Sequence, residues 1–162
     1  MRRSARAAAR LLAAISTAFA TAGCALPLAL AAWRQPHLPA CPGAIASTRG
    51  LPPGDFLLRE QVRVRGGGVD AGFVVAAERR GDELVVVGFN AFGAKAFAVT
   101  QRDVAVESRS FLGRALQVAP ENFLRDLHAG GRLSAESPER EEIARPGCGY
   151  TASYVRVERR PL

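Results

Sequence analysis

The chain has 162 residues, of which 48% are hydrophobic, 23% charged and 7% aromatic, and its formal net charge is +7. This length allows one compact domain, and the ordinary charged fraction excludes a disordered polyelectrolyte. No segment repeats at the period of a solenoid.

The basic excess is concentrated at the amino-terminus. Arg2, Arg3, Arg6 and Arg10 precede an apolar run over residues 11–22, and this stretch contains no acidic residue. A basic segment followed by an apolar one is typical of an export signal. Without residues 1–23, 18 basic residues face the same 15 acidic ones, and the net charge falls to +3. The charge is therefore largely a targeting feature, and we expect no nucleic-acid partner.

The export signal ends in Thr21-Ala22-Gly23-Cys24, which resembles a bacterial lipobox. In such signals small residues precede a cysteine whose thiol receives diacylglycerol. Ala22 and Gly23 fit, whereas Thr21 stands where leucine is usual. We predict a lipoprotein signal peptide over residues 1–23 and lipidation of Cys24. The next residue, Ala25, is not the aspartate that retains lipoproteins at the inner membrane of enteric bacteria, which favours the periplasmic face of the outer membrane.

Two other interpretations of this segment stay open. The nearly uncharged stretch 11–33 is long enough to span a bilayer as an inner-membrane signal anchor, although Gly23 and Pro27 interrupt it. A plain secretory signal cleaved near Ala31 or Ala32 is the other alternative. All three interpretations export the domain that follows.

Residues 24–54 are predicted to form a proline-rich tether. Six of the ten prolines fall between residues 25 and 54. Proline fixes φ and removes backbone donors, so we expect an extended segment with no core of its own.

With Cys24 assigned to lipid, Cys41 and Cys148 remain. An even remainder in an exported chain predicts one disulfide between them. The alternative is a zinc site, but neither cysteine has a second cysteine or a histidine at ligand spacing, so we expect no metal.

The folded body, residues 55–162, begins with alternating strands. From Leu58, Val62 and Val64 alternate with arginines, and a turn at residues 66–68 leads to a second strand that ends at residues 79–82. Residues 83–89 form a third strand that is apolar on both faces. A loop over residues 90–93, a fourth strand with Phe97 and Val99, a turn at 101–103 and a fifth strand at 104–109 complete an antiparallel meander.

The period changes once, at Pro120. This proline occupies a favoured first helical position, and the short amphipathic helix that it begins should stop at Gly130-Gly131. Residues 134–147 are predicted as a loop or a brief second helix from Pro138. Residues 150–158 form a closing strand. The fold class is mainly β, or α+β: an antiparallel curved sheet, or incomplete β-barrel, with one short covering helix.

Catalytic chemistry is not indicated. No Gly-x-Ser-x-Gly elbow, Walker loop or dinucleotide fingerprint is present, and the two histidines, His37 and His128, are isolated. We interpret Asp126 and His128 as solvated helix-end residues. We therefore expect a non-enzymatic protein with no cofactor.

Residues 85–99, which contain Asn90-Ala91-Phe92-Gly93 between two apolar strands, resemble the LolA/LolB-like outer-membrane lipoprotein family. Residues 116–127 also resemble the segment in which a proline-led helix follows the meander of LolB-like members. A related group of small lipoproteins of unknown function, found with lipid and aryl polyene biosynthesis genes, is as good a match. Ala91 replaces the loop proline of the family, and the chain is shorter than LolB-like members.

The resemblance implies an incomplete β-barrel whose apolar interior, covered by helices, holds the acyl chains of a lipoprotein. LolB-like members receive this cargo from a LolA-like carrier, and a hydrophobic residue before the loop glycine assists delivery to the membrane. The matching position here is Phe92. Residues that line such a lipid cavity would be Phe73, Val75, Val86, Phe97, Val99, Phe123 and Leu127.

Two functions follow from these expectations. The first is a lipid-anchored carrier or acceptor that binds acyl chains, lipoproteins or lipids in the half-barrel and helps their delivery to the outer membrane. The alternative is an envelope scaffold whose filled core only presents a surface to protein partners. Basic loops at Arg79, Arg80 and Arg102 would meet anionic head groups in either case.

Overall fold

The computed structural model describes residues 35–129, 132–134 and 137–162. The chain divides into two units, and the second, Pro36–Leu162, is the unit described below. The described strands, helix, disulfide and buried core all lie within this second unit. It therefore holds the contacts that an independently folding domain requires. Cys24 and the predicted signal segment lie outside the described residues.

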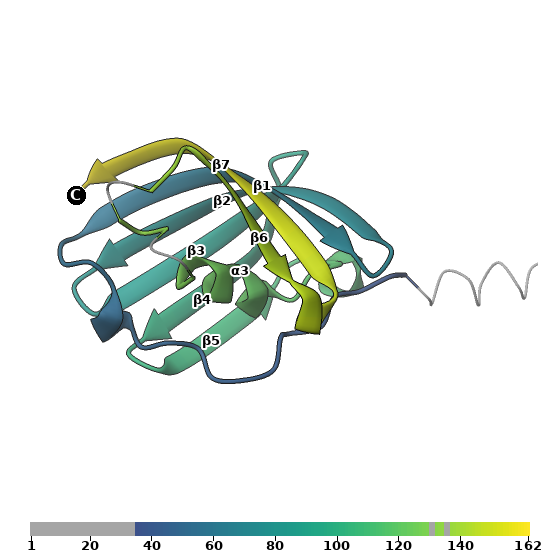
Figure 1. Ribbon diagram of the computed structural model, residues 1–162, viewed down its shortest axis with the longest axis horizontal. Coiled ribbons are helices and arrows are strands. Elements are labelled where there is room, and N and C mark those ends of the chain that lie inside the picture. The colour runs from purple at the N-terminus through teal and green to yellow at the C-terminus, as the bar shows by residue number, and fades with distance from the viewer. Residues whose placement is uncertain (1–34, 130–131, 135–136) are drawn as a thin grey trace, which may run out of the picture. The chain divides into compact units, whose positions relative to one another are not determined.

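Seven antiparallel strands form one open sheet in the order β5-β4-β3-β2-β1-β7-β6 (Figure 1). The last long strand returns to pair with the first, so β7 lies between β1 and β6. The strands are β1 (Phe56–Gly66), β2 (Val69–Arg80), β3 (Glu83–Asn90), β4 (Lys95–Arg102), β5 (Ala105–Ser110), β6 (Arg140–Arg145) and β7 (Tyr150–Pro161). The mainly β fold predicted from the alternating pattern is confirmed at this level.

Tight turns set the register of the meander. Gly66 pairs with Val69, and the two residues between them, Gly67 and Gly68, have φ values of 54° and 81°. Positive φ at both central positions is the geometry of a type I′ hairpin, which glycine adopts without steric cost. The predicted turn before β5 lies slightly later than expected, because Gln101 and Arg102 still belong to β4.

One face of the sheet, here called the inner face, carries the only α-helix in the described residues (Figure 1). Helix α3 (Pro120–Leu127) begins at the predicted proline and is capped by His128. Its apolar stripe, Phe123, Leu124 and Leu127, is buried. The expected stop at Gly130-Gly131 lies outside the described residues.

Strand β6 corrects the prediction for residues 134–147. The sequence suggests a loop or helix there, but Arg140–Arg145 pairs with β7 as an edge strand. Within β6 only Ile143 is buried, so the segment has no apolar alternation that would indicate a strand. Charged side chains are typical of exposed edge strands, because they discourage pairing with another chain.

Residues 36–51, here called the strap, fall within the predicted tether but are attached to the sheet domain. Leu38 forms a parallel bridge with Val118 and is 3% exposed. Thr48, in the short turn η1 (Thr48–Gly50), is also buried. The strap therefore contributes to the core of the domain, although it has none of its own.

Candidate functional site

The seven residues proposed to line a lipid cavity all lie in the core between the sheet and α3. None is more than 8% exposed: Phe73, Val75, Val86, Phe97, Val99, Phe123 and Leu127. The rings of Phe97 and Phe123 stack at 4.6 Å, and the edge of Phe73 meets Phe123 at 5.2 Å. The structure therefore brings these side chains together beneath α3, where they pack against one another as part of the core.

A glycine makes this packing possible. Gly88 in β3 faces Phe97 in β4, and a Cβ added to Gly88 would overlap the Phe97 ring. Glycine inside a strand often marks such a close approach.

The loop between β3 and β4 holds Phe92 in an exposed position. Asn90 organises the loop, since its Oδ1 accepts hydrogen bonds from the backbone N–H of Phe92 and of Ala94, each at 3.0 Å. The Gly93 N–H donates to the Asn90 carbonyl at 2.9 Å, and Gly93 has a φ of 75°. Phe92 itself is 94% exposed. The loop thus presents an aromatic side chain to solvent on a hydrogen-bonded backbone.

Basic and aromatic side chains lie near this loop. Lys95 Nζ is 4.7 Å from the centroid of the Phe111 ring, and the Arg109 guanidinium carbon is 5.1 Å from it. Phe111 is 41% exposed and follows β5, next to the beginning of β4. We call Phe92, Lys95, Arg109 and Phe111 the tip surface. It combines apolar rings with two cations at one end of the β4–β5 pair.

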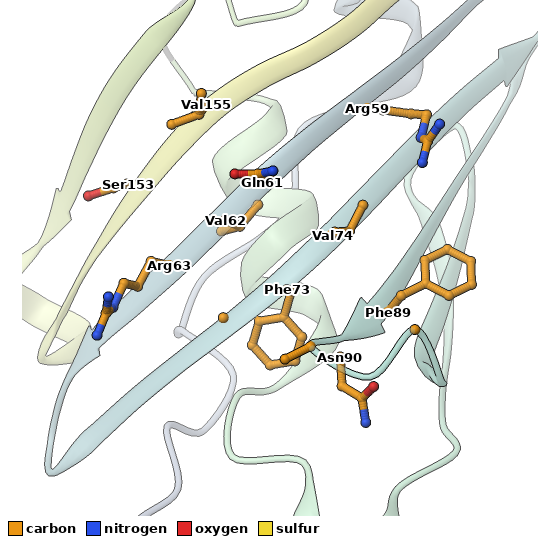
Figure 2. Close-up of a pocket in the computed structure, with 13 residues that line it drawn as sticks. Arg59, Gln61, Val62, Arg63, Phe73, Val74, Phe89, Asn90, Ser153 and Val155 are labelled. Atoms are coloured by element: carbon orange, nitrogen blue, oxygen red, sulfur yellow. The ribbon is translucent and has the colours of Figure 1, made fainter.

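A groove of about 650 Å³ lies on the outer face, opposite α3 (Figure 2). Its floor is β2, where Gly72 has no side chain and Val74 has a short one. The side chains of Arg59, Gln61 and Arg63 on β1, with Ser153 and Val155 of β7 beyond them, form one wall, and Phe89 with the β3–β4 loop forms the other. The sequence does not predict this groove. The signal for it was the third strand, whose apolar residues occupy both faces.

The prediction that Asp126 is solvated is wrong. Asp126 is 1% exposed, and its carboxylate accepts hydrogen bonds from Arg145 Nε at 2.9 Å and from the Tyr154 hydroxyl at 2.7 Å. The Tyr150 hydroxyl lies 3.2 Å from both carboxylate oxygens. The partners come from later strands, so the helix spacing alone does not reveal them. An aspartate held by three donors is a structural group that ties α3 to β7.

A second buried charged group, centred on Arg132, joins β1 to β6. Arg132 is 1% exposed, forms an ion pair with Glu60, and lies 3.3 Å from Glu141. Its guanidinium stacks over the Tyr154 ring at 3.4 Å. These charges are paired, as buried charges must be.

His128 is half-buried, and its Nε2 lies 2.7 Å from the Gln101 side-chain oxygen. Burial lowers the pKa of His128 below its usual value. Gln101 also donates to the carbonyls of Ala46 and Asp103, which ties the strap to the β4–β5 turn. The histidine therefore takes part in a structural network.

The basic loops are engaged in local contacts. Arg102 forms an ion pair with Glu83 at 2.6 Å, and Arg80 forms one with Glu78. Arg79 donates to the carbonyls of Gly81 and Pro52. Their guanidinium groups remain at the surface but are partly neutralised.

Cys41 and Cys148 form the disulfide that the sequence predicts, with their Cα atoms 5.5 Å apart. It joins the strap to η3 (Pro146–Cys148), just before β7. The Cys41 N–H donates to Asn122 Oδ1 at 2.8 Å, so the strap is also bonded to α3.

These features define a mainly β protein with a filled core and two exposed apolar features, the tip surface and the outer groove. No protein-family model matches the chain, and no curated protein matches it. No helix in the described part of the chain is long and apolar enough to cross a membrane. The same residues contain no group of three or more His, Cys, Asp or Glu side chains placed to hold a metal ion.

Proposed function

We propose that this chain is a non-enzymatic envelope lipoprotein with a LolA/LolB-like half-barrel architecture. It is anchored through Cys24 at the periplasmic face of the outer membrane. Its tip surface contacts lipid and assists the delivery of acyl-bearing cargo to the membrane. The observation that carries this proposal is Phe92, which is 94% exposed on a hydrogen-bonded loop.

The chemistry of the tip surface suits a membrane interface. An exposed aromatic ring gains about 2 kcal/mol when its apolar surface leaves water. A cation near an anionic surface contributes about 1 kcal/mol, and Lys95 and Arg109 flank Phe111. Together these gains amount to about 4 kcal/mol, which corresponds to a millimolar affinity, so the tip alone binds concentrated vesicles weakly and the lipid anchor would strengthen this contact.

The second candidate function, a scaffold for protein partners, is favoured by the packed interior. The seven residues proposed for the cavity are all buried against α3 or one another. A protein that stored acyl chains there would first have to move the helix and the strap. In the scaffold function the same tip surface would meet a protein, such as a LolA-like carrier, instead of lipid.

Vesicle flotation with the unit Pro36–Leu162 tests the proposal without a contribution from the anchor. Phe92→Glu should reduce the fraction that floats with phosphatidylglycerol vesicles at least five-fold, because it places a charge where the ring meets lipid. The matched control is Val104→Ser. Val104 is 66% exposed at the opposite end of β4, and its loss should leave flotation unchanged.

Circular dichroism should show that both variants keep the folded sheet. Equal flotation of the wild-type unit and the Phe92→Glu variant would overturn the membrane role. If neither floats but Phe92→Glu abolishes binding to a purified LolA-like carrier, the scaffold function is supported instead.

A further inference from the structure

We propose that the outer groove binds the acyl chain of an anionic single-chain amphiphile, such as a long-chain carboxylate. This site is on the face opposite α3, distinct from the interior that the family resemblance implies. The proposal rests on the groove alone and does not depend on the membrane role of Phe92.

The groove has the size and the division of polarity that such a ligand requires. Its volume of about 650 Å³ lies within the usual range for small-molecule sites, roughly 300–1,000 Å³. Across the sheet, Gln61 pairs with Val74, and Val74 pairs with Phe89. The short side chain of Val74 therefore lies between a polar wall on β1 and an aromatic wall on β3.

Gly72 keeps the floor of the groove open. It pairs with Arg63 of β1, and a Cβ built on Gly72 meets no atom within 4 Å. The packing of the protein's own atoms therefore does not require a glycine at position 72, in contrast to position 88 on the inner face. An interior strand glycine with open space above it is typical of a position that something else approaches.

The polar wall supplies a place for an anionic head group. Arg63 and Arg59 extend along β1 on the groove side. Arg63 is held by Asp70, with contacts of 2.7 and 2.8 Å that use its Nε and Nη2 atoms. Its Nη1 takes no part in this pair. The pair is more than half exposed, so its carboxylate competes only weakly with a ligand.

The backbone of the floor favours an acyl chain over a peptide. β2 is a central strand, paired along its length with β1 and for most of it with β3, so its amides are already bonded. An extended peptide lying on Val74 and Phe89 would bring its own amides against apolar surface without partners, at a cost of about 1–3 kcal/mol each. A hydrocarbon chain carries no such groups.

Titration of the unit Pro36–Leu162 with cis-parinaric acid, a fluorescent long-chain carboxylate, tests the site. Gly72→Leu fills the groove and should weaken binding more than ten-fold. The same change should leave the melting temperature equal or higher, because it replaces a glycine within a strand. Loss of binding would then reflect the filled groove, not a loss of fold.

Two substitutions in the Arg63–Asp70 pair should change the affinity for cis-parinaric acid in opposite directions. Arg63→Gln removes a cation and should weaken binding about five-fold, whereas Asp70→Asn removes a competing carboxylate and should tighten it about two-fold or more. If the pair had only a structural role, both substitutions would change the affinity in the same direction. Competition with lysophosphatidylglycerol and with oleate distinguishes a phosphate head group from a carboxylate.

Phe111→Ser, a change in the tip surface, should leave cis-parinaric acid binding unchanged, because neither Phe111 nor its neighbours in the chain line the groove. Failure of the membrane proposal and failure of this one are therefore separate results. Absence of saturable binding, or equal binding by Gly72→Leu, would overturn the inference. A dimer that Gly72→Leu dissociates would also overturn it, since the face would then belong to contacts between copies of the chain.

Discussion

At the scale of single residues, Asp126 is a buried group on which the stability of the domain depends. Its carboxylate accepts bonds from Arg145, Tyr150 and Tyr154 in a buried setting. Asp126→Ala leaves these donors without an acceptor, and we expect it to destabilise the unit by about 3 kcal/mol. Urea denaturation measures this loss. The control is Asp70→Asn at an exposed pair, which should change the stability little because solvent screens such pairs. Equal effects would contradict the structural role of Asp126.

The same residues predict how stability depends on alkaline pH. Burial, with a further contribution from the Asp126 charge, raises the pKa values of Tyr150 and Tyr154 above the usual value near 10. The folded state therefore holds these protons more tightly than the unfolded chain. The stability that they contribute is complete below about pH 10 and is lost as the pH rises above it.

Phenolate absorbance provides a direct readout, because the chain has two tyrosines and both lie in this cluster. We expect little phenolate in the folded protein at pH 10 and a rise that coincides with unfolding. Tyr154→Phe should weaken the alkaline dependence. A tyrosine that titrates near pH 10 while circular dichroism remains native would contradict this account.

At the scale of the elements, two strand glycines should respond in opposite ways. Gly88→Ala forces a methyl group into the Phe97 ring between β3 and β4, and overpacking of this kind costs about 1–3 kcal/mol. Gly72→Ala meets open space and should be neutral or slightly stabilising. Thermal denaturation of both variants checks the difference. Similar melting temperatures would contradict the packing described beneath α3.

The disulfide attaches the strap to the sheet. Cys41 and Cys148 are 107 residues apart, and closure of so long a loop contributes about 4–5 kcal/mol in the chain-entropy model. A Cys41→Ser/Cys148→Ser variant of the unit should therefore lose about this much stability in urea. Thiol titration of the unfolded wild-type unit should detect no free cysteine. A variant as stable as the wild type would show that the strap is held by its other contacts alone.

The elements also show what the sequence can and cannot predict. The meander and α3 were predictable because apolar residues recur at period two and then follow a proline at a helical spacing. β6 was not, since Ile143 is its only buried residue. The burial of Asp126 depends on partners in β6 and β7, which follow the helix by 19 to 28 residues. The outer groove lies on neighbouring strands of the meander, where the pattern of β3 indicates a second apolar face but not a hollow. A glycine such as Gly72 leaves no side-chain pattern that would indicate an open face.

At the scale of the whole molecule, the two faces of the sheet have different roles. The inner face is filled by α3 and by the strap, and it accounts for the stability of the fold. The outer face carries the groove, whose wall includes the loop that presents Phe92. The proposed contacts with lipid therefore lie outside the core. Substitutions at Phe92 and Gly72 can test them without disturbing the buried side chains.

The central claim is that this domain is held at a membrane by a lipid on Cys24. Mass spectrometry of the mature protein from its native membrane tests it most directly. We predict an amino-terminal Cys24 that carries diacylglycerol, at the start of a chain of 139 residues. A mature protein that retains residues 1–23, or one that begins near Ala31 or Ala32, would contradict the claim.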